Sequence, residues 1–369
     1  MNRQVVGSYE VAKETALILR QAISTTRWYN VDLLIEFITE LGSRLVAAQP
    51  KELAVGNIVR RALKIIREVA RGELHDTQQE FEPEEDEEEG EEESEEGEEE
   101  ETTVPQQRPQ IMVNDRHLLK QSSMFNLLSD GPVKKHDSTP QNTYNLKPLI
   151  IQEINEEIIA DLESVYKGIA DQATDFIHAN EVIMTIGKSR TVQEFLIRAA
   201  QKRKFQVIVA ETSPTYQGHD MARTLSTAGI DTTVIADSAI FAAMPRVNKV
   251  VLGSHAVLAN GGLVAVTGSH LLAAAAKHHS TPVLVCTALY KLSPLFAYDS
   301  DTFNVAVAPH DVLNYQEGSL IDKVSISNPY YDYVQPELVS LFIHNLGSAP
   351  PTYVYRLIND NYDQQDASL

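Results

Sequence analysis

Apolar residues recur at helical spacing through the first 72 positions of the chain. Three stripes follow one another: Val11, Leu17 and Ile18; then Val31, Leu34, Ile35 and Ile38, ending near Gly42; then Leu53, Ile58, Leu63, Ile66 and Val69, ending at Gly72. Because residues three and four positions apart share one face of a helix, the stripes predict three amphipathic helices with these residues in the core. We therefore expect a helical N-terminal domain over residues 1–75.

The pattern changes after residue 148. A long amphipathic helix is predicted over 150–178, and short apolar runs then alternate with helical ones. The predicted strands are 182–186, 205–210, 232–235, 247–252 and 283–286, and the predicted helices are 192–200, 219–228, 239–244 and 270–278. This alternation is typical of a doubly wound parallel sheet, and wholly apolar runs indicate strands covered on both faces. The fold class is α/β, with a Rossmann-like domain over residues 148–369.

Residues 76–147 show neither pattern. All but four of the 20 residues from 82 to 101 are Asp or Glu, and these 16 groups supply most of the net charge of -21. Like charges at this density repel one another and bury no apolar surface, so we predict a disordered acidic insertion. The insertion is either a solvating spacer or a docking segment for a basic partner. Its negative charge excludes direct nucleic-acid binding through this segment. A linker follows, in which the apolar patch 124–128 could form a short docking helix.

The composition limits the class of protein further. The 369 residues are 43% hydrophobic, enough to bury a sizeable core in two domains. A single cysteine excludes a disulfide framework or a Cys-based zinc site, and it fits a reducing compartment. No apolar run approaches the ~18–20 residues of a membrane span, and the N-terminus lacks a signal-peptide pattern. We expect a cytosolic protein with no membrane partner.

The loop after the first predicted strand holds the first candidate site. Ligands of parallel sheets bind beyond the C-terminal strand ends, where loops lead into helix N-termini. Gly187, Lys188 and Ser189 stand there and resemble part of a phosphate-binding P-loop. That motif requires another glycine at the position of Val182, so a nucleotide triphosphatase is excluded. The loop could still bind an anion, or Ser189 could simply cap the following helix.

The remaining loops add polar residues without a catalytic motif. The candidates are Arg190, Asp237, His255 and Asn260, of which Asp237 fits a helix cap as well as a pocket rim. No Gly-x-Gly-x-x-Gly fingerprint follows a strand, so no dinucleotide cofactor is expected. His278 and His279 are adjacent and diverge on a helix, so no metal site is expected either.

Two strand ends carry residues for which we expect structural roles. Cys286 ends an apolar strand, which indicates a buried small hydrophobe rather than a nucleophile. Gly253 ends another strand, at a turn predicted to need a positive φ. A valine at this position should therefore disrupt folding or assembly.

Six blocks in order along the chain resemble one known family. They are 185–192, 236–239, 250–255, 258–262, 267–269 and 328–333. They are similar to the group that joins sugar-phosphate isomerases with the regulatory subunits of eukaryotic translation initiation factor 2B. The stretches 246–249, 276–282 and 290–294 strengthen the likeness to the regulatory subunits. The N-terminal helices agree less specifically, and the acidic tract lies outside the resemblance.

The resemblance implies that isomerase chemistry has been lost. The enzymes of the family use a cysteine and an aspartate where this chain has Gly187 and His255, and Val266 replaces a substrate-holding lysine. In the helical domain, Gln49-Pro50-Lys51 replaces the enzymes' Arg-Pro-Thr. General acid–base catalysis needs two titratable partners, and His255 alone, although it could titrate near neutrality, does not provide them. We expect no catalytic residue, and a vestigial pocket formed by Gly187, Lys188, Ser189, Arg190, Asp237, His255 and Asn260.

The resemblance also implies partners. The chain would join the alpha and delta regulatory subunits and the gamma and epsilon catalytic subunits in a two-fold symmetric heterodecamer. That complex exchanges GDP for GTP on translation initiation factor 2, and this subunit would help bind the substrate's alpha subunit and sense its phosphorylation. Two alternatives stay open: a ribose phosphate isomerase using His255 and Asp237, and an acidic scaffold or chaperone that depends on the acidic tract.

Overall fold

A computed structural model of the chain describes residues 7–72, 143–299, 302–316, 318–321 and 323–367. The described residues belong to one compact unit. The predicted acidic insertion and the patch 124–128 lie outside the described residues. No helix within the described ranges is long and apolar enough to cross a bilayer.

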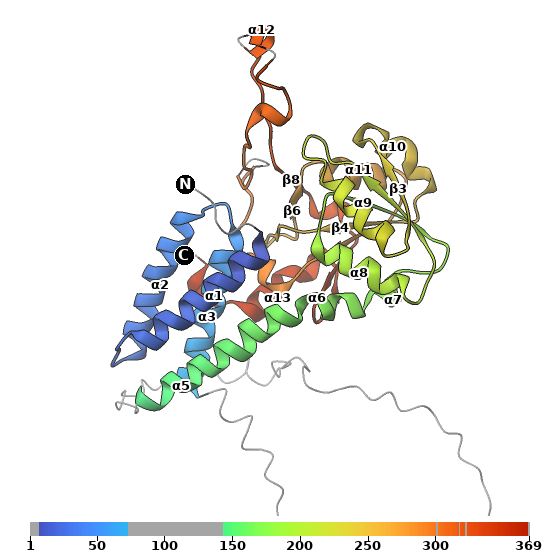
Figure 1. Ribbon diagram of the computed structural model, residues 1–369. Coiled ribbons are helices and arrows are strands. Elements are labelled where there is room, and N and C mark those ends of the chain that lie inside the picture. Colours follow the sequence, from blue (N-terminus) through green and yellow to red (C-terminus); the bar gives the residue numbers. More distant parts are fainter. Residues whose placement is uncertain (1–6, 73–142, 300–301, 317, 322, 368–369) are drawn as a thin grey trace, which may run out of the picture. The chain divides into compact units, whose positions relative to one another are not determined.

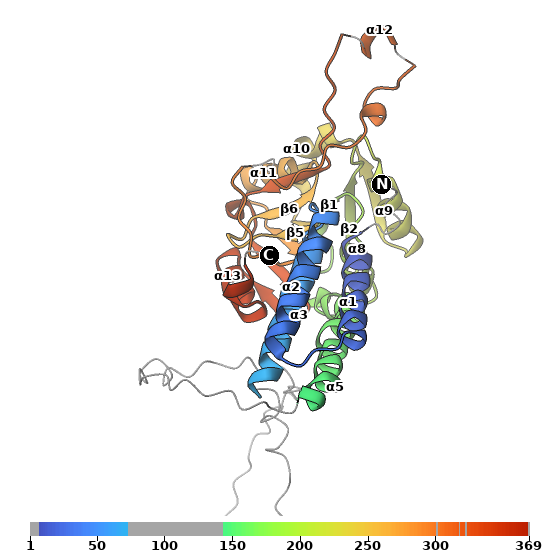
Figure 2. The same cartoon turned by 90° about the vertical axis from the view of Figure 1, so that its left-hand side faces the viewer.

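The three predicted N-terminal helices are present (Figures 1 and 2). They are α1 (Ser8–Thr25), α2 (Val31–Ala48) and α3 (Leu53–Arg71). The Asn30 side chain caps α2, and Gly72 ends α3 in the left-handed region, at φ +74°. The predicted end of the second helix near Gly42 is wrong, because Gly42 is buried inside α2, which continues for another turn and a half.

Helix α3 is buried most extensively, because it packs against α1, α2 and α5 (Thr143–Glu153). The predicted stripe of α3 lies in the core, but the prediction for α1 is partly wrong. Ile18 is 41% exposed, and α1 instead turns Ala12, Ala16 and Leu19 inward. The small alanine side chains allow α1 to approach α3 closely, a signal that a search for large apolar residues misses.

The helix predicted over 150–178 is present and begins earlier, at Thr143, with helical backbone continuing to Asp171. A π-helical stretch, Ile154–Ala160, follows α5 and leads into α6 (Asp161–Asp171) and the short α7 (Ala173–Phe176). Its predicted apolar face is buried, with Ile154, Ile158, Leu162 and Val165 all 3% exposed or less. These residues join the N-terminal helices and one face of the sheet in a single core cluster. The division into a helical domain and an α/β domain at the predicted boundaries stays a prediction.

The sheet confirms the predicted α/β class. Its strand order is β10-β9-β7-β4-β1-β2-β3, in which every pair is parallel except β9 with β10. The strands are β1 (Val182–Ile186), β2 (Gln206–Ala210), β3 (Asp231–Ile235), β4 (Lys249–Gly253), β7 (Val283–Cys286), β9 (Leu341–His344) and β10 (Gly347–Ala349). The order reverses between β1 and β4, which makes this pair the switch point of a doubly wound sheet.

Helices cover both faces of the sheet (Figure 1). One core cluster contains α6, α8 (Arg190–Ala200) and α9 (Gln217–Thr227), and the other contains α10 (Ile240–Ala243), α11 (Ser269–His278) and α13 (Val354–Asn361). Neighbouring residues of one strand enter different clusters, as Ile183 and Met184 of β1 do. This alternation explains why the strand sequences are apolar throughout.

Two features differ from the prediction. Strand β3 is an edge strand whose residues are exposed or half-buried, so it is not covered on both faces as expected. A second, antiparallel sheet of β5 (Ala256–Val257), β6 (Leu263–Val266) and β8 (Tyr331–Val334) was not predicted. Strands of two to four residues are too short to show a periodicity of their own.

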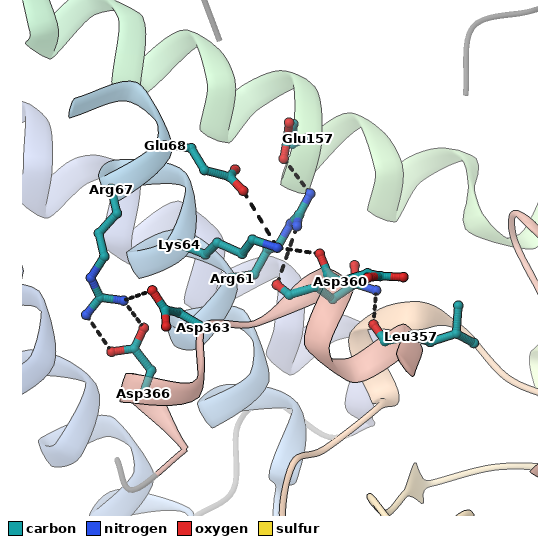
Figure 3. A network of polar contacts seen from close by, with 10 residues as sticks. Arg61, Lys64, Arg67, Glu68, Glu157, Leu357, Asp360, Asp363 and Asp366 are labelled. Atoms are coloured by element: carbon teal, nitrogen blue, oxygen red, sulfur yellow. Dashed lines mark hydrogen bonds and ion pairs between the residues drawn. The ribbon is translucent and has the colours of Figure 1, made fainter. Parts of the chain in front are cut away.

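The last described residues are held on α3 by a network of polar contacts (Figure 3). Arg67 donates to both carboxylate oxygens of Asp366, at 2.5 and 2.8 Å, and reaches Asp363 at 3.4 Å. Arg60 donates to the Asp366 carbonyl oxygen at 2.9 Å. Bidentate arginine–carboxylate pairs fix geometry as well as contributing energy. The C-terminal segment is therefore fastened to the N-terminal helices.

We expect Arg67→Ala to destabilise the protein, because the Asp366 side chain is only 6% exposed and would lose its cation. The free energy of unfolding should fall by about 2 kcal/mol, which is less than the full cost of breaking a buried ion pair. Chemical denaturation measures it. Arg71→Ala, at an exposed position one turn further along α3, is the matched control. Equal stability of the two variants would show that the Arg67–Asp366 contact contributes nothing to the free energy of unfolding.

Candidate functional site

A cavity of about 500 Å³ lies beyond the C-terminal ends of β1 and β4, at the switch point of the sheet. Its walls include the start of α1, the residues before α3, the turn between β1 and α8, the end of β4, the residues after β7 and the start of β8. Ligands of doubly wound sheets bind at this position. The N-terminal helices therefore complete a site that the sheet alone would leave open.

The turn between β1 and α8 depends on Gly187. This glycine has φ +72°, and a Cβ there would lie 2.8 Å from Val266 Cγ1. Its backbone N–H donates to Thr212 Oγ1 at 2.8 Å. Ser189 then caps α8, with its side chain accepting a hydrogen bond from the Val192 N–H. The first turn of α8 thus starts at the cavity wall, and the capping role considered for Ser189 is confirmed.

The two cations of this turn already have neighbours. Lys188 lies 3.7 Å from Asp220, and its side chain is about half exposed. The Arg190 guanidinium lies over the rings of Tyr166 and Tyr9, at 4.5 and 5.6 Å from their centroids. Burial raises the pKa of Tyr166 to about 12, although the Arg190 charge acts in the opposite direction. Arg190 therefore links α8 to α1 and α6.

His255 is held between two neighbours. Its ring stacks on Tyr331, with centroids 4.2 Å apart. Its Nε2 lies 3.3 Å from the Lys51 carbonyl oxygen and its Nδ1 lies 3.2 Å from the Tyr331 hydroxyl. These contacts fit a neutral ring that donates from Nε2 and accepts at Nδ1. Burial lowers the pKa of His255 to about 4, so the expectation that it titrates near neutrality is wrong.

Asp237 and Asn260 do not line the cavity. The Asp237 carboxylate accepts from the Thr212 and Ser213 N–H groups, at 2.9 and 2.6 Å, and so ties two loops together. Asn260 donates to the Tyr333 hydroxyl at 2.8 Å. Of the predicted pocket residues, the cavity wall contains Lys188, Ser189, Arg190 and His255, with Gly187 shaping their turn.

Glu52 and Lys291 are among the cavity residues that sequence reasoning missed. Lys291 is 7% exposed, and its Nζ donates to the Ser254 carbonyl oxygen at 2.7 Å. Burial lowers the pKa of Lys291 to about 8, while the Glu52 carboxylate acts to raise it. A single lysine after an apolar strand gives no sequence signal of burial. Only the fold brings it near a glutamate from the start of α3.

The nearby thiol is inert. Cys286 is fully buried, and burial raises the pKa of its thiol, which agrees with its interpretation as a small hydrophobe. Within the described ranges, no group of three or more His, Cys, Asp or Glu side chains could hold a metal ion. The cavity thus offers cations, a helix N-terminus and a buried amine. It offers no carboxylate–thiol pair for proton transfer.

The comparisons with known proteins identify the class to which this site and fold belong. The family model described as the initiation factor 2 subunit family matches residues 4–351. The chain therefore belongs to the initiation factor 2 subunit family, as the six sequence blocks indicated.

Within that family, the chain is similar to beta subunits along its whole length. It is 48% identical to translation initiation factor eIF2B subunit beta of Dictyostelium discoideum, over 99% of this chain and 93% of that one. It is 44% identical to the beta subunit of Schizosaccharomyces pombe, over 100% and 95%. The crystal structure of eIF2B beta from Chaetomium thermophilum superposes with a TM-score of 0.67 at 25% identity, over 100% and 89%. A chain of the tetrameric eIF2B-beta2-delta2 complex from C. thermophilum superposes with a TM-score of 0.66 at 25% sequence identity. The match covers 98% of this chain and 91% of that one.

We expect His255 to make stability fall in mild acid. Its pKa in the folded state lies below its unfolded value of 6.5, so the unfolded state binds the proton more readily between pH 6.5 and 4. Protonation of His255 in the unfolded state should lower the free energy of unfolding by about 2 kcal/mol at pH 5 relative to pH 7. Denaturation at both pH values should show a smaller drop for His255→Gln than for the parent. His310→Gln, at an exposed site, should leave the drop unchanged.

The positive φ predicted for Gly253 is wrong, but the position leaves no room for a side chain. Gly253 is not among the glycines with positive φ, but a Cβ there would lie 2.4 Å from Ser189 Cβ and Oγ. We expect Gly253→Ala to destabilise the protein by about 1–3 kcal/mol, because the capping residue of α8 must move. Adding Ser189→Gly should restore part of that loss, since glycine is tolerated as an N-cap. Additive effects in a double-mutant cycle would contradict this account.

Proposed function

We propose that the chain is a non-catalytic regulatory subunit of the guanine nucleotide exchange factor that acts on translation initiation factor 2. The observation that carries this proposal is the similarity to beta subunits of eIF2B, at 44% and 48% identity over nearly the whole of both chains. The matched regions cover 95% and 93% of these two relatives, which supports a role like theirs for the whole chain.

The cavity supports a non-catalytic role. The resemblance places a catalytic cysteine and aspartate of the isomerases at Gly187 and His255. Glycine has no side chain to transfer a proton, and His255 is neutral at physiological pH because of its burial. Proton transfer needs a general acid and a general base, and neither member of the isomerases' cysteine–aspartate pair is present at these two positions.

The proposed partners follow from the relatives. A solved structure of similar fold is described as a tetrameric beta2-delta2 complex, and we propose that this chain assembles with a delta subunit in the same manner. In the complete particle, an alpha subunit and the catalytic gamma and epsilon subunits would join them in a two-fold symmetric heterodecamer. This subunit would contribute to binding the alpha subunit of initiation factor 2 and to sensing its phosphorylation, in the cytosol.

Native mass spectrometry of the tagged chain, purified gently from its own cells at low and raised salt, tests the assignment. We expect a salt-resistant particle with four other distinct subunits. Deletion of residues 82–101 should leave this core assembly intact, whereas an acidic scaffold would lose its partners. A monomer or homodimer that interconverts ribose phosphates, and loses this activity in His255→Ala, would establish the isomerase alternative instead.

A further inference from the structure

The two edges of the seven-stranded sheet differ in how well they are protected. Strand β10, at one edge, has three residues and is followed by Pro350 and Pro351, whose missing N–H groups end the ladder. Strand β3, at the other edge, pairs with β2 along all five of its residues and contains neither proline nor lysine. Edge strands usually carry such residues, because an open edge pairs readily with other chains. The edge of β3 is therefore a candidate interaction surface.

The backbone of β3 has pairing groups on its outer side. The Glu211 N–H donates to the Ile235 carbonyl oxygen at 2.9 Å, so the backbone groups of Ile235 face β2. These groups alternate in direction along a strand, which turns those of Thr232 and Val234 outward. No described residue donates to or accepts from the outward backbone groups of these two residues. An added strand could pair with both.

The side chains of this edge also suit an added strand. Residues 232–235 are all β-branched, the residue type that packs best on a pleated surface. Helix α9 packs against β3, yet Val234 remains 44% exposed. Phe241 lies on α10, which follows β3 in the chain, and is 50% exposed (Figure 1). An extended segment beside β3 would cover Val234 while it continues the backbone ladder, as in other cases of strand addition.

Carboxylates at both ends of β3 decide which kind of segment fits. Asp231 begins the strand and is exposed, and Asp237 follows the last residue of the strand by two positions. Arg223, on the helix that packs against β3, already pairs with Asp220 at 3.0 Å. Electrostatic complementarity therefore favours a segment with a lysine or arginine near each end.

The same carboxylates disfavour the other occupants. Antiparallel pairing of two β3 strands about Thr233 would bring Asp231 of one copy towards Asp237 of the other at both ends, where like charges repel. The chain's own acidic tract, residues 82–101, would meet the same repulsion. The occupant that fits is thus a basic segment of a different chain.

We propose that the outer edge of β3 is a docking site for an extended, basic segment of a partner chain, which adds to the sheet as a further strand. The inference goes beyond the regulatory function and does not depend on it. It assigns an interaction to the edge of the sheet, whereas the cavity lies beyond the ends of β1 and β4.

Hydrogen–deuterium exchange, resolved to single amides, tests the docking on the full chain purified gently from its own cells. At an empty edge, the outward N–H groups of Thr232 and Val234 should exchange at close to the rate of an unstructured peptide. We expect both to exchange about a hundredfold more slowly, because a docked strand protects them. Unprotected exchange at both amides would overturn the proposal.

Photo-cross-linking in the same cells identifies the occupant. A short aliphatic diazirine amino acid in place of Val234 should, on illumination, join a segment of another chain that has lysine or arginine on both sides of the attachment point. Attachment to β3 of a second copy, to residues 73–142 of this chain or to an acidic segment would overturn the proposal, as would the absence of any cross-linked peptide.

Two substitutions separate docking from the stability of β3. Val234→Pro removes an outward N–H but no bond between β2 and β3, so protection at Thr232 should be lost while the thermal midpoint stays close to the parent. Val234→Thr is the matched control, because it keeps the N–H and the β-branched shape, and protection should persist. Protection at Thr232 that survives Val234→Pro would overturn the assignment. If that variant does not fold, exchange in the parent decides the case.

Asp231→Lys tests the basic character of the segment. Exchange at Thr232 should become about tenfold faster or more, because the substitution places a like charge beside the end of the docked strand. Glu10→Lys, which makes the same change at an exposed position on α1, should leave exchange at Thr232 as in the parent. Equal exchange in the two variants would contradict the charge requirement.

Discussion

The burial of α3 is the constraint on which the rest of the structure depends. This helix packs against α1, α2 and α5, and its arginines hold the C-terminal segment through Asp366. The residues just before α3 form one wall of the cavity, where the Lys51 carbonyl oxygen meets His255. A shift of α3 would therefore change both the hydrophobic core and the cavity, since close-packed interiors transmit strain.

The cavity at the switch point of the sheet depends on close approaches between small residues. Gly187 allows the turn to approach Val266, and Ser189 fits against Gly253 only because neither position has a larger side chain. These close approaches keep the start of α8 at the cavity wall. The titratable groups that remain have lost their ordinary behaviour through burial: His255 is kept neutral, and the pKa of Lys291 is lowered.

Much of the fold was predictable, because its signals are local. The three N-terminal helices and the five parallel strands β1, β2, β3, β4 and β7 were found from periodicity, with most boundaries within a few residues. The misses have physical causes. Alanines form the inner face of α1, and strands of two to four residues in the second sheet carry no period. The exposure of β3 follows from its place at the sheet edge, which no local pattern encodes.

The sequence by itself determined the fold class, the order of its elements and the family, because periodicity, turn residues and spaced blocks are properties of the chain in one dimension. The tertiary structure alone decided which polar residues share the cavity. Asp237 and Asn260 stand in the expected loops, yet Asp237 binds the loop after β2 and Asn260 binds Tyr333 of β8. Glu52 and Lys291 are far apart in sequence and carry no motif, and only the packing of α3 against the turn Leu289–Lys291 after β7 places both at the cavity wall, where burial lowers the pKa of the amine.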